Sequence, residues 1–136
     1  MYTFTEKEKE VYRYARKRHQ DKITDLYEQR DKAYELEKWN QVLDINKEIN
    51  KKVEEFNMRF PKGRTYLDVH GMTTEGAINY VARMTEGSGK KWMIETGQGR
   101  HSIDGKPCIK TRLLDIYGKR IRVYENNPGK LILDLE

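Results

Sequence analysis

Two residues two positions apart have the chemistry to move protons. In the segment LDVHGMT, Asp68 precedes His70, and on an extended strand both side chains would lie on one face. A carboxylate can orient or charge an imidazole, whose ordinary pKa of about 6.5 suits proton transfer at cellular pH. The pair indicates acid–base chemistry, although the same two side chains could instead solvate a sheet face or cap the following helix.

A second segment, TGQGRHS from Thr96 to Ser102, has the composition of an anion-binding loop. Two glycines one residue apart can expose consecutive backbone N–H groups, and the guanidinium of Arg100 is a planar charged donor. His101 adds a second imidazole. The alternative is a plain turn that needs positive φ at its glycines. The predicted phosphate-binding residues here are Gly97, Gln98, Gly99, Arg100 and Ser102.

A third set of residues could hold the rest of a nucleic acid. On a strand from residue 120 to 125, Ile121 and Val123 would enter the core, and the side chains that alternate with them would face outward. Two cations and an aromatic ring on an open sheet face can bind phosphate and stack a base, although they could equally be ordinary strand decoration. The predicted members of this set are Arg120, Arg122 and Tyr124, with Lys106 and Lys110 on the nearby helix start.

The elements that would position these residues alternate along the chain from Arg64 onward. Strands are predicted at 65–70, 91–96, 120–125 and 130–135, and helices at 74–84 and 107–117. This β-α-β-α-β-β order predicts an α/β two-layer sandwich, with both helices on one side of a four-stranded mixed sheet. If the first two strands are parallel, His70 and the Gly97 loop meet where open α/β sheets place ligands.

The N-terminal part follows a different pattern, because residues 5–60 contain no Gly and no Pro. Thr5 and Glu8 have the spacing of a capping box, and two amphipathic stripes change phase between Leu36 and Asn40. A single helix over this length would reach about 80 Å at 1.5 Å per residue, so a helical hairpin is predicted. We expect a hairpin extension at 1–60 and an α/β domain at 64–136.

Charge, cysteine count and hydropathy indicate which partners and which kinds of site this protein can have. The net charge of the 136 residues is +5, and residues 61–136 hold most of the excess, with 13 Lys and Arg against 9 Asp and Glu. Such a basic domain is suited to a polyanionic partner. The single cysteine, Cys108, excludes an internal disulfide framework and a cysteine-rich zinc module. With no apolar run of membrane-spanning length, we expect a cytoplasmic protein with no membrane partner.

Together, LDVHGMT, TGQGRHS and the segment NPGKLILDL (Asn127 to Leu135) resemble the Smr domain, the small MutS-related family, over essentially all of residues 64–136. The helical stretch before them is similar to an extension found in eukaryotic members. The resemblance implies a fold similar to the C-terminal domain of translation initiation factor three. It also implies nuclease activity, which several members have, including eukaryotic members with this extension that cleave messenger RNA on collided ribosomes during no-go decay.

On this basis the sequence predicts an endoribonuclease that cleaves single-stranded mRNA, with the ribosome as a further partner. Asp68, His70 and His101 would surround the scissile phosphate, one histidine acting as base on the 2′-hydroxyl and the other protonating the leaving oxygen. Asp68 and His70 could ligate a cation, but two ligands with no nearby carboxylate cluster favour a reaction without a metal or other cofactor. The alternatives are a non-catalytic RNA- or ribosome-binding module and a DNA-nicking endonuclease.

Overall fold

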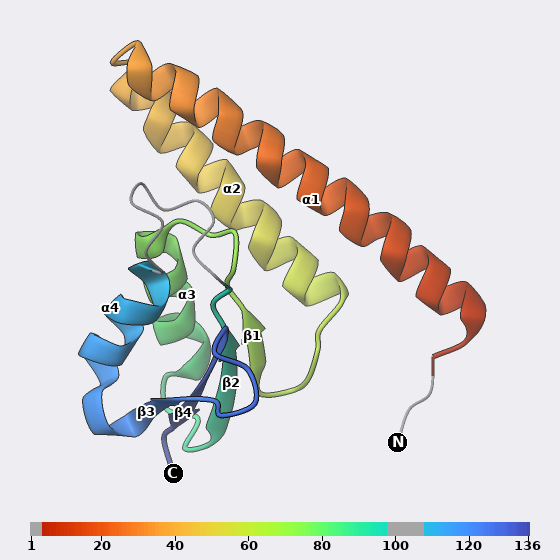
Figure 1. Ribbon diagram of the computed structural model, residues 1–136, viewed down its shortest axis with the longest axis vertical. Coiled ribbons are helices and arrows are strands. Elements are labelled where there is room, and N and C mark those ends of the chain that lie inside the picture. Colours follow the sequence, from red (N-terminus) through yellow and green to blue (C-terminus); the bar gives the residue numbers. More distant parts are fainter. Residues whose placement is uncertain (1–3, 98–107) are drawn as a thin grey trace. The chain divides into compact units, whose positions relative to one another are not determined.

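A computed structural model describes residues 4–97 and 108–136 of the chain. Two helices come first and a four-stranded mixed sheet with two further helices follows, so the coarse α/β architecture is confirmed (Figure 1). The elements are α1 (Glu6–Glu35), α2 (Trp39–Arg59), β1 (Tyr66–Asp68), α3 (Thr74–Thr85), β2 (Lys91–Glu95), α4 (Cys108–Tyr117), the 3₁₀ turn η1 (Gly118–Arg120), β3 (Ile121–Val123) and β4 (Lys130–Asp134).

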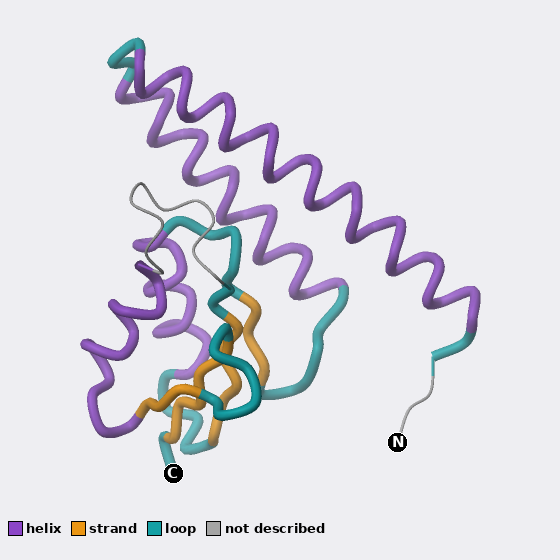
Figure 2. The backbone as a smooth tube through the Cα atoms, viewed as in Figure 1, coloured by secondary structure: helices purple, strands orange, loops and turns teal. Residues whose placement is uncertain are grey.

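The two N-terminal helices are separated by a three-residue turn, which Figure 2 shows at the end of α1. The predicted capping box is present at the start of α1, where the Thr5 hydroxyl accepts from the backbone N–H of Glu8 at 3.1 Å. At the other end the N–H of Lys38 donates to the carbonyl of Ala33, and Glu37 adopts φ +56°. This is a Schellman ending with glutamate in the left-handed position that glycine usually takes, so the break lies where the stripes change phase.

The chain divides into two compact units inside α2, Met1–Glu48 and Ile49–Glu136. This division differs from the change in composition at residues 60–64, because the second half of α2 bonds to the α/β elements. Asn50 accepts from the backbone N–H of Thr73 and donates to its hydroxyl, both at 2.9 Å. Asn57 donates to the backbone carbonyl of Asp68 at 2.7 Å, so the second half of α2 lies along the outer edge of the first strand.

The sheet has the strand order β1-β2-β4-β3, in which β1 and β2 are parallel and the other pairs are antiparallel. Strand alternation places Leu67, Ile94 and Leu131 on one face, where all three are buried. The helices α3 and α4 lie together on one side of this sheet in Figure 1, and their residues Val81 and Leu113 are fully buried. The parallel pairing of β1 and β2, which was the condition for His70 and the Gly97 loop to meet, is present.

The opposite face of the sheet carries the polar residues. One register row across it runs Tyr66, Met93, Ile132 and Arg122, and the next contains Asp68, Glu95 and Lys130. The predictions for the third strand were partly wrong. Arg120 lies in the 3₁₀ turn before β3, and Val123 is 38% exposed because β3 is an edge strand. Within the described part of the chain, no helix combines the length and apolarity needed to cross a bilayer.

Candidate active site

Asp68 and His70 stand at the end of β1, and the local sequence explains their placement. Val69 is fully buried and its N–H donates to the carbonyl of Glu95 at 2.8 Å, so the extended pairing continues past the strand. Its neighbours therefore emerge on the other face, as predicted. Gly71 then turns the chain with φ +85°.

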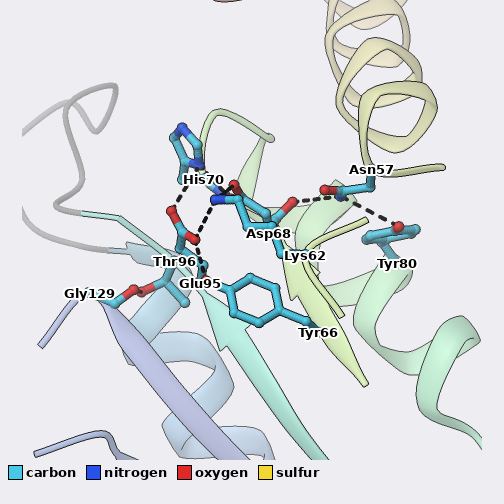
Figure 3. Close-up of polar contacts among 9 residues, drawn as sticks. All are labelled: Asn57, Lys62, Tyr66, Asp68, His70, Tyr80, Glu95, Thr96 and Gly129. Atoms are coloured by element: carbon cyan, nitrogen blue, oxygen red, sulfur yellow. Dashed lines mark hydrogen bonds and ion pairs between the residues drawn. The ribbon is translucent and has the colours of Figure 1, made fainter. Parts of the chain in front are cut away.

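The two side chains interact with each other. The imidazole Nδ1 of His70 bonds to Oδ1 of Asp68, and the backbone N–H of His70 donates to the same oxygen at 3.2 Å (Figure 3). The Asp68 side chain is only 12% exposed, whereas the His70 side chain is 49% exposed. Helix α3 is capped by the hydroxyl of Thr73, which accepts from the N–H of Gly76 at 3.1 Å. Asp68 and His70 therefore do not cap that helix, and they bond to each other rather than standing as two separate polar side chains on the sheet face.

Two charged residues that the sequence analysis did not single out complete the cluster. Glu95 on β2 is the register partner of Asp68 and lies on the same face. The ammonium of Lys62 donates to Oδ2 of Asp68 at 2.9 Å and to Oε1 of Glu95 at 2.8 Å, as Figure 3 shows. The hydroxyl of Tyr66 bonds to the same Glu95 oxygen. We call Lys62, Asp68, His70 and Glu95 the charge cluster.

A weak signal for Glu95 was present in the sequence. It directly precedes the Thr96 motif on the second strand, and if that strand is parallel to the first, Glu95 can lie beside Asp68. Lys62 had no such signal, because it lies in an irregular segment before β1, where neither strand nor helix periodicity applies.

The cluster sets the protonation states of its members. Hydrogen bonding to Asp68 raises the pKa of His70 against the opposing effect of burial; the charges of Asp68 and Glu95 also raise it, and Lys62 lowers it. Burial acts to raise the pKa of Asp68, but His70 and Lys62 together hold it below its usual value. Because ionised Asp68 can only accept, Nδ1 of His70 carries a hydrogen and Nε2 is the nitrogen that exchanges its proton.

All three sequence motifs meet at this end of the sheet. Gly97 follows β2 with φ +73°, and a Cβ placed there would lie 2.9 Å from Cβ of His70. The carbonyl of Gly129 accepts from the N–H groups of Thr96 at 2.8 Å and Gly97 at 3.2 Å, and from the Thr96 hydroxyl at 3.3 Å. The start of the second motif therefore lies beside the side chain of His70, and Gly129 ties the third motif to the second.

This arrangement corrects one expectation about the anion-binding loop. The N–H of Gly97 points to the carbonyl of Gly129, so it is not an anion donor as predicted. The remaining predicted members of that loop and its surroundings lie outside the described residues: Gln98, Gly99, Arg100, His101, Ser102 and Lys106.

The other predicted binding residues lie on α4 and on or just after β3. The ammonium of Lys110 donates to the carbonyl of Pro128 at 3.0 Å and so braces the β3–β4 turn. Arg122 is exposed on β3, three strand spacings or about 14 Å from β1. At that distance from β1 it is placed to contact a neighbouring part of a ligand, and its role in phosphate binding stays a prediction. Tyr124 is half-buried just after β3, and its N–H donates to the carbonyl of Lys130 at 2.9 Å.

The charge cluster also changes the argument about metals. The expectation of no nearby carboxylate was wrong, because single ligand atoms from Asp68, His70 and Glu95 all lie within 4.8 Å of one another. A third potential ligand is therefore present. The ammonium of Lys62, however, bonds to both carboxylates, so a cation is already in place between them.

The contact between Gly97 and His70 gives a first prediction. In Gly97→Ala, the new methyl group must displace His70, which weakens its bond to Asp68, so we expect the pKa of His70 to fall. NMR titration of the His70 ring measures this. Gly87→Ala is the matched control, since Gly87 has φ +69° but nothing within 4 Å of an added Cβ. Both variants bear a backbone strain of about 1 to 3 kcal/mol, and an equal His70 pKa in both would contradict the prediction.

Comparisons of the chain with models of protein families, with curated proteins and with solved structures found no match.

Proposed function

We propose that this protein is an endoribonuclease of the Smr type that cleaves single-stranded RNA without a metal ion. The observation that carries the proposal is the meeting of LDVHG, the start of TGQGRHS and the glycine of NPGK around the Asp68–His70 pair. Residues so far apart in the chain converge on a half-exposed imidazole whose protonation is controlled by a buried carboxylate. Perturbed titratable groups of this kind are frequent at active sites.

His70 is suited to the role of general acid. Its hydrogen bond to Asp68 raises its pKa and so favours the charged ring, and Nε2 is the proton-bearing atom left for a substrate. In the proposed reaction a base removes the proton of the ribose 2′-hydroxyl, and the 2′-oxygen attacks the phosphorus. The bond to the 5′-oxygen breaks, and His70 donates its proton to that oxygen. The products are a 2′,3′-cyclic phosphate and a free 5′-hydroxyl.

The partner roles fall to residues of the second motif. With His70 as the acid, the base would be His101, and Arg100 would stabilise the extra negative charge; both lie outside the described residues. In this assignment the described half of the site holds the proton donor, and the rest of the TGQGRHS segment supplies the base and the anion donor.

The polar face of the sheet would hold the RNA on either side of the scissile phosphate. Lys130 is next to Glu95 in the register, and its ammonium lies 5.3 Å from the centroid of the Tyr66 ring. Beyond it, the guanidinium of Arg122 and the ring of Tyr124 can contact further phosphates and bases. Sheets that present cations and aromatic rings on an open face are common platforms for single strands.

The biological setting follows from the resemblance to the Smr family. It supports messenger RNA on stalled or collided ribosomes as the substrate, a cytoplasmic location, and a fold similar to the C-terminal domain of translation initiation factor three. The helical extension would then contact the ribosome or another partner rather than take part in the chemistry.

The test is incubation of end-labelled single-stranded RNA with purified protein in excess EDTA. We expect cleavage to persist and the upstream product to end in a 2′,3′-cyclic phosphate. Loss of cleavage under EDTA would contradict the metal-free reaction. RNA binding without cleavage would favour a binding module, and relaxation of supercoiled plasmid without RNA cleavage would favour a DNA-nicking enzyme.

A further inference from the structure

The charge cluster contains an arrangement that is unfavourable without a cation. Asp68 and Glu95 are direct register partners on neighbouring strands, and their side chains share one face. Like charges directly opposite each other destabilise a sheet, and Asp68 is buried, where repulsion is poorly screened. Two carboxylates and an imidazole at this spacing also form a donor set that divalent transition metals accept.

Lys62, which lies before β1 and outside the sheet, supplies the cation that the two carboxylates need. Its ammonium contacts Asp68 at 2.9 Å and Glu95 at 2.8 Å and approaches the Tyr66 ring, with its nitrogen 5.7 Å from the ring centroid. The hydrogen bonds to both carboxylates raise the pKa of Lys62 despite the burial that acts to lower it. The amine therefore stays charged at neutral pH.

The position of the Lys62 ammonium also decides whether Nδ1 of His70 keeps its hydrogen. This Nδ1 lies 3.8 Å from Oε2 of Glu95 and bonds to Oδ1 of Asp68. A metal ion among the three groups would take a lone pair from the imidazole and replace a proton. With the ammonium in that place, the ring keeps its Nδ1 hydrogen and can exchange the proton on Nε2.

We propose that Lys62 is the resident cation of this site: its ammonium takes the place that a divalent metal ion would occupy among Asp68, Glu95 and His70. The inference goes beyond the proposed function, since it concerns the free protein, and only its consequence for proton transfer by His70 rests on that function. Lys62 is on this view a positioning residue. Its neutral replacement exposes a latent metal site.

The test compares binding of Zn²⁺ and Co²⁺ by calorimetry and by Co²⁺ absorption, without RNA. We expect Lys62→Met to bind at least about tenfold more tightly than the wild-type protein, because two carboxylates and an imidazole lose their competing cation. Lys62→Arg should bind as weakly as wild type, since it retains the charge. Lys62→Gln is the second neutral variant, for use if the methionine variant folds poorly by circular dichroism.

The double variant Lys62→Met with Glu95→Gln is the matched control, because it lacks one ligand while keeping His19, Cys108 and every other potential ligand. We expect it to lose the gained affinity. NMR signals of the His70 ring should respond to Zn²⁺ in Lys62→Met and remain unchanged in wild type. Equal metal affinity in wild type and both neutral variants, or a gain that survives Glu95→Gln, would overturn the inference. These outcomes are independent of RNA cleavage, so the inference and the proposed function can fail separately.

Discussion

His70→Ala is expected to lower the rate of RNA cleavage by about 10² to 10⁴, the usual contribution of a positioned acid or base. The ring is half-exposed and its removal leaves no large cavity, so the fold should persist. Single-turnover cleavage of a labelled RNA in EDTA measures the chemical step, and RNA binding measured separately should change little. The loss would therefore appear in kcat rather than in the dissociation constant.

His19→Ala is the matched control for this variant. His19 lies on α1, in the compact unit Met1–Glu48, and belongs to none of the three motifs. We expect its replacement to leave the cleavage rate within a few-fold of wild type. A His70→Ala protein that folds, binds RNA and cleaves at the wild-type rate would contradict the assignment of His70 as the acid.

Asp68→Asn is expected to reduce cleavage nearly as strongly, through the imidazole rather than through contact with RNA. The amide has nearly the same shape as the carboxylate, but it carries no charge and can donate as well as accept a hydrogen bond. The ring of His70 can then take the wrong tautomer, and the charged ring loses its strongest support. We expect a loss of about 10² or more in kcat.

The pH dependence gives a second readout for Asp68→Asn. The hydrogen bond and charge of Asp68 favour protonated His70 and raise its pKa, so the substitution must lower that pKa. If the charged ring is the active acid, wild-type activity is lost as pH rises through the raised pKa, and the variant loses activity at a lower pH. Titration of the ring by NMR should show the same shift. The exposed Asp115→Asn on α4 serves as control, and an unchanged His70 pKa in Asp68→Asn would contradict the argument.

The same ion pair links stability to pH. Asp68, with its lowered pKa, contributes stability above its unfolded-state pKa, and this contribution is lost as pH falls through the folded-state value. His70, with its raised pKa, contributes below its unfolded-state pKa, and this is lost as pH rises through the folded-state value. The pair is therefore complete only between the two folded-state pKa values.

Much of the fold could be predicted because local rules set it. Strand alternation placed Asp68 and His70 on one face, and the change of stripe located the hairpin break near Glu37 even without a glycine. The error at Val123 has a different origin. Alternation predicts the direction of a side chain, whereas its burial depends on what covers an edge strand.

The amino-acid sequence by itself determined the order of the elements, the hairpin break, and the shared face of Asp68 and His70, because each depends on residues near one another in the chain. Only the tertiary structure decided that Glu95 and Lys62 join Asp68 and His70, that Gly129 takes the N–H of Gly97, and that Arg122 lies three strands away. Those outcomes depend on register between distant strands and on an irregular segment, for which no local periodicity exists. The charge on the imidazole, and with it the chemistry, is set by these long-range neighbours.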